Sequence, residues 1–282
     1  MLKLVDGIVE LYKKVATSIP PDIEEALKEA LRLEKPDSNA YRALVIILEN
    51  IKLARTQGRP ICQDTGIPIF AVKLPSGLIQ RDIRDIILEA TTLAVKKVPL
   101  RENNIDIVND LPLGLEEDSG MPVINFSEHD KPSLIVDLML KGAGCENAGR
   151  MYKLPDSSLN AQRDMDGIRR CVVDAVINIQ GKACPPYTIA VGVGASRDQV
   201  TALSKKLLFK RINSENASPT LALLEKTLLA DINSLNIGTS GLTGAVTALA
   251  VKIGAQKRHP ASYFVDVSFS CWANRRGRLI WS

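Results

Sequence analysis

The sequence predicts an α+β fold in which helices wrap a mixed β-sheet. Segments with an apolar residue every three or four positions, typical of amphipathic helices, are interspersed with short alternating or wholly apolar runs, typical of strands. Several helices separate the strands in no strict strand–helix–strand order, which argues against a purely parallel sheet. The chain has 282 residues, enough to bury a large core, and we expect one large domain over residues 1–282.

Residues 1–57 are expected to form a helical N-terminal segment. Apolar positions recur with helical spacing in residues 4–15, 23–33 and 41–54, and Pro20 and Pro21 separate the first two helices. A Gly- and Pro-rich loop, GRPICQDTG, then leads into a short β-like run.

The later elements follow from the same two periodicities. The expected helices cover residues 82–98, 159–179, 198–210 and 219–232, and the expected strands cover residues 67–72, 133–140, 187–194 and 263–272. A polar loop at 101–120 and the Gly-rich turns KGAGCENAG and GTSGLTG lie between them.

Composition excludes several classes of protein. Apolar residues make up 45% and charged residues 24%, values that exclude disordered, collagen-like and disulfide-scaffold chains. No apolar run approaches the roughly 18 residues of a membrane span, and the opening MLKLVDGIVELYKK contains acids, unlike a signal peptide. We therefore expect a cytoplasmic protein that does not bind membranes.

The net charge of +4 is too small to indicate a nucleic-acid-binding protein, but the charge is unevenly placed. Residues 251–282 carry six basic side chains against one acidic side chain. This basic end is typical of a pocket for a small anion, of a surface that meets an acidic partner, or simply of a solvated tail.

Three of the five cysteines lie beside turn-forming residues: Cys62, Cys184 and Cys271. Backbone N–H groups in such loops can point at sulfur, which lowers a thiol pKa and suits metal or cluster binding. Taken singly, each cysteine also reads as a small buried apolar residue. Their spacings of 122 and 87 residues match no local zinc or ferredoxin pattern.

Five strings in order resemble the iron–sulfur class I fumarase and L-tartrate dehydratase family: ICQDTGIPIF, KGAGCENAGRM, GKACPPYTIAVGVG, GTSGLTG and HPASYFVDVSFSCWANRRG. The resemblance spans the whole chain, and matches of this length are far more specific than a single short motif. The chain resembles the α subunit of the two-subunit form. The resemblance therefore implies a β subunit that completes the active site, and we expect an α2β2 assembly.

The resemblance also implies a cofactor. The family's three cluster-binding cysteines fall on Cys62, Cys184 and Cys271, which would hold a [4Fe-4S] cluster and leave its fourth iron open. An open iron is a Lewis acid that can bind a hydroxy acid and help hydroxide to leave. Cys145 stands where relatives often have serine, so it is left out of the ligand set, and Cys171 lies within a periodic apolar helix.

The resemblance assigns catalytic roles near the cluster and the substrate to Gln63, Asp64 and His259. Arg101 matches a substrate-binding arginine, whose guanidinium can grip a carboxylate with two hydrogen bonds. The same resemblance places Lys141, Gly142, Gly144 and Asn147 at the substrate. Without it, Asp64 and His259 read as turn residues and Arg101 as an exposed side chain.

The function expected from this resemblance is the reversible hydration of a C4 dicarboxylate, fumarate to L-malate first and L-tartrate dehydration second. The proton-abstracting base is expected from the β subunit. Two other classes stay open: an iron–sulfur electron-transfer or redox-sensing protein, which needs a fourth ligand such as Cys145, and a non-catalytic scaffold subunit.

Overall fold

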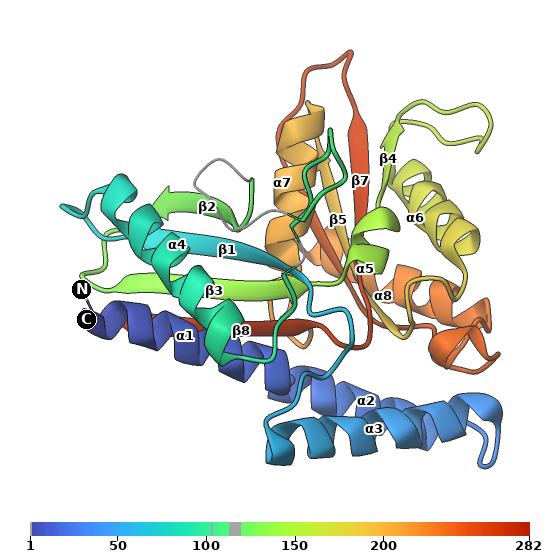
Figure 1. Cartoon of the computed structure of the whole chain (residues 1–282). Helices are drawn as coiled ribbons and strands as arrows, with labels where there is room; N and C mark the ends of the chain where they lie inside the picture. Colours follow the sequence, from blue (N-terminus) through green and yellow to red (C-terminus); the bar gives the residue numbers. More distant parts are fainter. Residues whose placement is uncertain (1, 103, 113–119) are drawn as a thin grey trace. The chain divides into compact units, whose positions relative to one another are not determined.

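The computed structural model describes residues 2–102, 104–112 and 120–282. Its mixture of helices and mixed sheets confirms the predicted α+β class (Figure 1). The strands form two four-stranded sheets where the sequence analysis expected one. The helices are α1 (Leu2–Thr17), α2 (Pro21–Leu33), α3 (Asn39–Gln57), α4 (Gln80–Lys97), α5 (Ala143–Asn147), α6 (Met165–Ile179), α7 (Arg197–Leu207) and α8 (Pro219–Ser234), with a 3₁₀ turn, η1, at Thr239–Gly241.

The strands are β1 (Ile67–Leu74), β2 (Val123–Glu128), β3 (Leu134–Lys141), β4 (Arg150–Lys153), β5 (Tyr187–Gly194), β6 (Ala248–Ala255), β7 (Phe264–Ser270) and β8 (Arg275–Trp281). Contacts within the chain fall into two compact units. Unit 1 contains Met1–Pro20, Glu49–Ala143 and Ala273–Ser282, and unit 2 contains Pro21–Leu48 and Gly144–Trp272.

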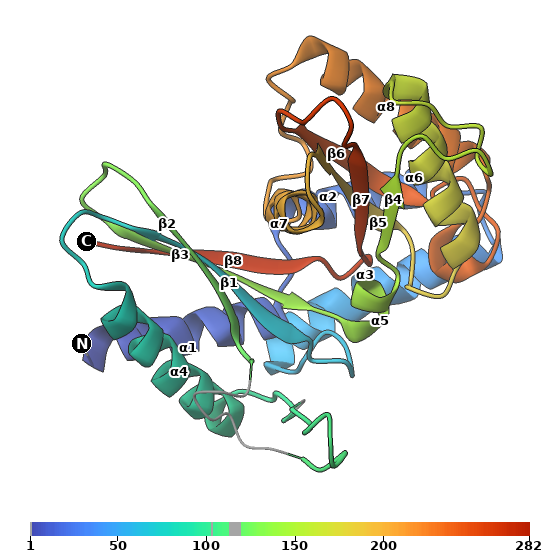
Figure 2. The same ribbon diagram turned by 90° about the horizontal axis from the view of Figure 1, so that it is seen from above.

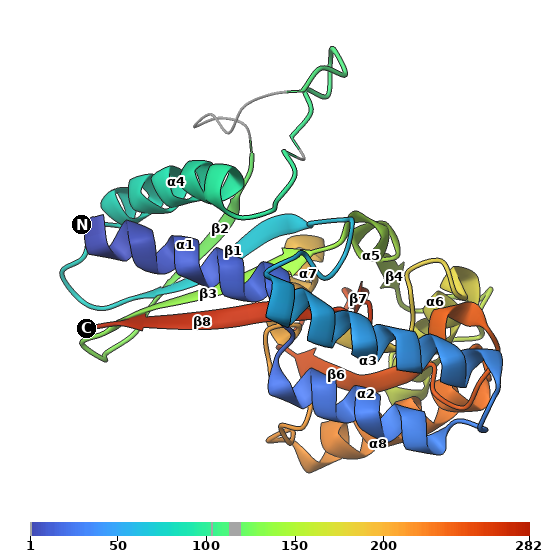
Figure 3. The ribbon, with the colours of Figure 1, turned by 60° about the horizontal axis from the view of Figure 1, so that its bottom comes forward.

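Unit 1 is a sheet of order β2-β1-β3-β8 with helices α1 and α4 packed on it. β1 is parallel to β2 and antiparallel to β3, which is antiparallel to β8. The two helices lie side by side (Figures 2 and 3) and share one apolar core with the strands. At its centre the rings of Tyr12 and Phe70 meet edge to face, with centroids 5.7 Å apart. The Tyr12 hydroxyl is hydrogen-bonded to the hydroxyl of Thr91 at 2.8 Å, so this buried polar group has a partner.

The last strand, β8, closes unit 1 against the first helix. A side chain at Gly277 would meet Val15 at 2.7 Å and Leu11 at 2.9 Å, so only glycine lets α1 approach the strand this closely. On the same strand, Arg278 binds both carboxylate oxygens of Asp137 on β3, at 2.6 and 2.9 Å. This bidentate pair fixes the register of β8 on β3.

Unit 2 is a sheet of order β4-β7-β5-β6, in which β7 is antiparallel to β4 and β5 while β6 is parallel to β5. Side chains of α6 and α8 share its core, where the rings of Tyr187 and Phe269 meet edge to face at 5.4 Å. The helix start predicted from the sequence, residue 159, is six residues too early, because α6 begins at Met165. Asp164 sets the true start, because its carboxylate accepts a hydrogen bond from the Gly167 amide at 2.7 Å and caps the helix.

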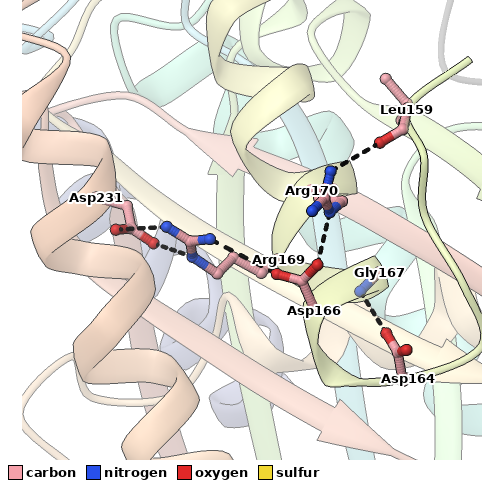
Figure 4. A network of polar contacts seen from close by, with 7 residues as sticks. All are labelled: Leu159, Asp164, Asp166, Gly167, Arg169, Arg170 and Asp231. Carbon is pink, nitrogen blue, oxygen red and sulfur yellow. Dashed lines mark hydrogen bonds and ion pairs between the residues drawn. The ribbon is translucent and has the colours of Figure 1, made fainter.

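Charged side chains join α6 to α8 at the surface of unit 2 (Figure 4). Arg169 on α6 binds both carboxylate oxygens of Asp231 on α8, at 2.6 and 3.0 Å. Within α6, Asp166 pairs with Arg170 one turn later. These pairs raise the pKa of Arg169 and lower that of Asp166, each because an opposite charge and its hydrogen bonds favour the charged form.

The outer edge of β6 is occupied by side chains rather than by another strand. Glu225 accepts a hydrogen bond from the Ile253 amide at 2.7 Å, and Asn216 donates to the Ile253 carbonyl at 2.8 Å. Asn233 accepts from the amides of Thr247 and Ala248 just before and at the start of the strand. These contacts satisfy backbone groups that would otherwise attract a foreign strand.

Most predicted elements are confirmed within a few residues, including the three helices of the N-terminal segment. Of the loop expected at 101–120, residues 103 and 113–119 lie outside the described residues. Among the residues that the structure describes, the helices are all too short or too polar to cross a membrane.

Candidate active-site loops

The Cys62 loop in unit 1 lies between α3 and β1 and is anchored just before the cysteine. The Ile61 amide donates to the Ala16 carbonyl at 3.0 Å, and the Ile61 carbonyl accepts from the Asn50 side chain at 2.9 Å. Cys62 itself is half-buried and Gln63 is exposed. The hydrogen bonds of Ile61 therefore fix the backbone directly before Cys62 and Gln63.

Asp64 ties this loop to the Gly-rich turn that follows β3. Its Oδ1 accepts from the Gly66 amide at 2.9 Å, and its Oδ2 accepts from the Ala143 amide at 2.7 Å. A Cβ placed on Gly142 would lie 3.1 Å from that same Oδ2. The glycine thus lets the carboxylate approach the turn closely.

Arg101 is held beside the same loop through its backbone. The Arg101 amide donates to the hydroxyl oxygen of Thr65 at 3.1 Å, and Thr65 is buried. The Arg101 side chain is exposed. Lys141, at the end of β3, is buried and pairs in register with Ile67, the first residue of β1. Unit 1 therefore gathers the predicted residues 62–64, 101, 141 and 142 around one loop and one strand end.

The Cys184 loop in unit 2 follows α6 and leads into β5. The Tyr187 hydroxyl donates to the Gln180 carbonyl at 2.6 Å and accepts from the Ala183 amide at 3.4 Å, which holds the turn closed. Burial raises the pKa of this hydroxyl, so it stays protonated and keeps its role as a donor. Cys184 is exposed and has a positive φ of 56°.

Cys184 and Cys271 are brought together within unit 2. The amide of Trp272 donates to the Cys184 carbonyl at 3.2 Å, which joins the loop before β5 to the residues directly after β7. Cys271 is half-buried. Two of the three predicted cluster cysteines, separated by 87 residues in the sequence, are therefore neighbours in the fold.

The two other cysteines differ from these in their surroundings. Cys145 is buried, and its thiol donates to the Ala183 carbonyl at a sulfur–oxygen distance of 3.7 Å. Cys171 is fully buried in the core of unit 2, and burial raises the pKa of its thiol to about 12. Cys171 is therefore a core residue, as predicted. Gly144 and Asn147 are exposed on either side of Cys145.

His259 lies away from these cysteines in unit 2. It precedes β7 whereas Cys271 follows it, and the seven residues of this strand put about 20 Å between its ends. The His259 side chain is exposed and accepts a hydrogen bond from the Ala261 amide at 3.1 Å. Within unit 2, His259 therefore lies beyond the opposite end of β7 from Cys271, and its predicted catalytic role stays a prediction.

Sequence reasoning missed the residues that position these loops, chiefly Thr65, Tyr187 and Trp272. Arg275, which lies four residues after Cys271, is 2% exposed, and its Nε and Nη1 atoms have no hydrogen-bond partner among the described residues.

No group of three or more His, Cys, Asp or Glu side chains in the described part of the chain is arranged to hold a single metal ion. Cys62 belongs to unit 1, and Cys184 and Cys271 belong to unit 2. The convergence of all three sulfurs therefore stays a prediction.

Comparison with known proteins identifies the class to which these loops belong. The family model described as "Fumarate hydratase (Fumerase)" matches residues 5–280. The chain belongs to the fumarate hydratase family, a family of hydro-lyases.

Proteins of two kinds are similar to this chain in sequence. A Geobacillus stearothermophilus protein assigned as a class I fumarate hydratase is 39% identical over 279 residues, which cover 98% of this chain and 54% of the relative. A Methanocaldococcus jannaschii protein assigned as an L(+)-tartrate dehydratase α subunit is 35% identical over 98% of this chain and 96% of its own length. The L(+)-tartrate dehydratase α subunit of Escherichia coli K12 is 30% identical over 99% of this chain and 90% of its own length. The chain thus spans about half of the first relative and nearly all of the other two.

Proposed function

We propose that this chain is the α subunit of a hydro-lyase that reversibly hydrates a C4 dicarboxylate, with fumarate and L-malate as the first candidate pair. One observation carries the proposal: a single loop holds Cys62 and Asp64, and its Thr65 fixes the backbone of Arg101 beside them. The loop thus combines a candidate cluster ligand with groups that recognise a carboxylate substrate.

The residues fit a [4Fe-4S] cluster held by Cys62, Cys184 and Cys271. Thiolates are the usual ligands of such clusters, and these three cysteines are exposed or half-buried, whereas Cys145 and Cys171 are buried. Arg275 is buried, and its Nε and Nη1 atoms have no hydrogen-bond partner among the described residues, which also suits a nearby group of negative charge. When bound, such a cluster supplies a Lewis-acidic iron that makes a hydroxyl a better leaving group.

The chain's own residues bind and orient the substrate in this proposal. Arg101 binds one carboxylate through two parallel hydrogen bonds, and Gln63 contacts the substrate with its exposed amide. Asp64 already accepts two backbone hydrogen bonds, so its first effect is to hold the Gly142 turn in place. The base that removes the proton comes from the β subunit.

L-Tartrate is the second candidate substrate. The two relatives matched over 96% and 90% of their length carry the tartrate dehydratase α-subunit name. Dehydration of L-malate and of L-tartrate removes a hydroxyl from one carbon and a proton from the neighbouring carbon, which together leave as water, so the same binding groups serve either substrate. An electron carrier with four cysteine ligands is less well supported, because the Cys145 thiol is buried and bonded to the Ala183 carbonyl.

The partner in this proposal is a β subunit in an α2β2 assembly, since two relatives are named as α subunits. The cytoplasm is the proposed location. Each of the five cysteines is a thiol rather than half of a disulfide, as a reducing compartment requires.

The test is anaerobic reconstitution of the chain with iron, sulfide and its β subunit, followed by assays with fumarate, L-malate and L-tartrate. We expect turnover of at least one diacid by the complex and none by either subunit alone. A reconstituted complex that cycles electrons reversibly but turns over no diacid would overturn the proposal in favour of an electron carrier.

A further inference from the structure

The loop that begins at Arg101 carries a cluster of exposed aliphatic side chains. Ile107 is 99% exposed and Val108 is 85% exposed, and Ile105 and Leu111 are both more than half exposed. Single exposed apolar residues are ordinary on a protein surface, but four within seven residues are a local concentration that is typical of an interaction surface. We call these four residues the apolar turn.

Hydrogen bonds within the apolar turn, made by its backbone and by the Asp106 side chain, hold it in shape. The Asp106 carboxylate accepts from the amides of Val108 and Asn109 at 2.7 and 2.9 Å, and these bonds lower its pKa. The Asp106 amide donates to the Leu111 carbonyl at 2.8 Å, and Ile105 forms an isolated antiparallel bridge with Pro112. The aliphatic tip is therefore presented by an ordered turn, which costs less entropy on binding than an unstructured loop.

The base of this turn is fixed beside the candidate substrate-binding residue. The Arg101 amide is bonded to Thr65, and Asn104, three residues later, is buried. The exposed tip thus begins only a few residues after both anchors. A protein that completes the site around Arg101 has to come close to this turn.

The charge of the turn indicates the chemistry of its partner. Residues 102–112 contain three acids, Glu102, Asp106 and Asp110, and no lysine or arginine. An apolar tip with an acidic border fits an apolar depression with a basic rim.

We propose that the apolar turn docks into the β subunit and so positions that subunit against the site around Arg101. This inference rests on the proposed function, in which the β subunit supplies the base. The β subunit is the occupant chosen over a second copy of this chain, because the Geobacillus relative has about as much sequence again outside the matched region.

The test compares the double variant Ile107→Ser/Val108→Ser with the control Leu223→Ser, which removes an exposed leucine of α8 in unit 2. The dissociation constant for the purified β subunit is measured by calorimetry, and self-association of the chain by analytical ultracentrifugation. Because both tip residues are exposed, the double variant should keep its circular dichroism spectrum and melting temperature. We expect its dissociation constant to rise about tenfold or more, and that of Leu223→Ser to stay unchanged.

Unchanged affinity of the double variant for the β subunit would overturn the docking proposal. Loss of self-association, with β-subunit binding intact, would overturn it in favour of a contact between copies of this chain. Binding and activity are separate measurements here. A wild-type complex that forms through the turn yet turns over no diacid would reject the proposed function while supporting the docking surface.

Discussion

The carboxylate of Asp64 and the amide of Ala143 are joined by a hydrogen bond of 2.7 Å, which fastens the Cys62 loop to the turn that follows β3. The two residues are 79 positions apart in the sequence. Gly142 makes the approach possible, since a Cβ there would lie 3.1 Å from the carboxylate. The shape of the candidate site therefore depends on a contact between a side chain and a backbone group.

Asp64→Asn should destabilise unit 1 and abolish most activity of the complex. The amide that replaces one carboxylate oxygen would face a backbone N–H group, so one hydrogen bond to a charged group is lost and two donors oppose each other. We expect a loss of about 1–3 kcal/mol in the free energy of unfolding, measured by urea denaturation. The control Asp130→Asn changes an exposed carboxylate between β2 and β3 and should have little effect on either measurement. Full stability of Asp64→Asn would contradict the clamp described here.

Gly142→Ala and Gly144→Ala form a matched pair within one turn. Gly142 faces the Asp64 carboxylate, whereas a Cβ on Gly144 would meet nothing within 4 Å. We expect Gly142→Ala to lower both the melting temperature and activity, and Gly144→Ala to leave the melting temperature unchanged. A fall in activity of Gly144→Ala at normal stability would support its predicted contact with the substrate. Equal melting temperatures for the two variants would argue against close packing at Gly142.

Thr65→Val should weaken substrate binding more than turnover. The variant keeps the shape of the side chain but removes the hydroxyl oxygen that accepts from the Arg101 amide. Loss of one hydrogen bond of about 1 kcal/mol corresponds to roughly a fivefold rise in KM, with kcat changed less. Thr65→Ser keeps the hydroxyl and should restore KM. If Thr65→Val lowered kcat alone, Thr65 would not act through the position of Arg101.

Cysteine replacements separate the proposed ligands from the packed cysteines. Cys184→Ser should abolish iron binding and activity after reconstitution, because an exposed ligand is removed. Cys171→Ser should keep its iron and lose about 1–3 kcal/mol of stability, because a hydroxyl replaces a fully buried thiol. Cys145→Ser should also keep its iron. Iron analysis and visible absorption spectra check all three, and full iron content in Cys184→Ser would refute its assignment as a ligand.

The elements with clear periodicity were predictable from the sequence, and β8 shows why others were not. Its sequence, RRGRLIW, begins with charged residues that hide the strand pattern. Arg278 on this strand is bound by Asp137, which lies 141 residues earlier in the sequence. A long-range ion pair of this kind leaves no local signal.

The candidate site likewise contains some features that the sequence predicts and others that it does not. Cysteines beside turns could be found from their neighbours and from the family resemblance. The contact between Cys184 and Trp272 could not, because it joins two backbone groups from distant loops. The partner of Asp64 is likewise a backbone amide, and only the adjacent Gly142 hinted at a close approach. The catalytic role of His259 stays a prediction, because the structure shows only that β7 lies between it and Cys271 within unit 2.

Unit 1 draws its first helix and its last strand from opposite ends of the sequence, and this has a cost during protein synthesis. A ribosome that has just made β3 must translate residues Gly144–Trp272, the larger part of unit 2, before β8 can pair with β3. During that interval the edge of β3 has no β8 to cover it, and exposed edges of this kind recruit other chains. The newborn protein therefore needs shielding until its last residues emerge, and the surface that α1 offers to Gly277 and Leu279 stays open for the same time.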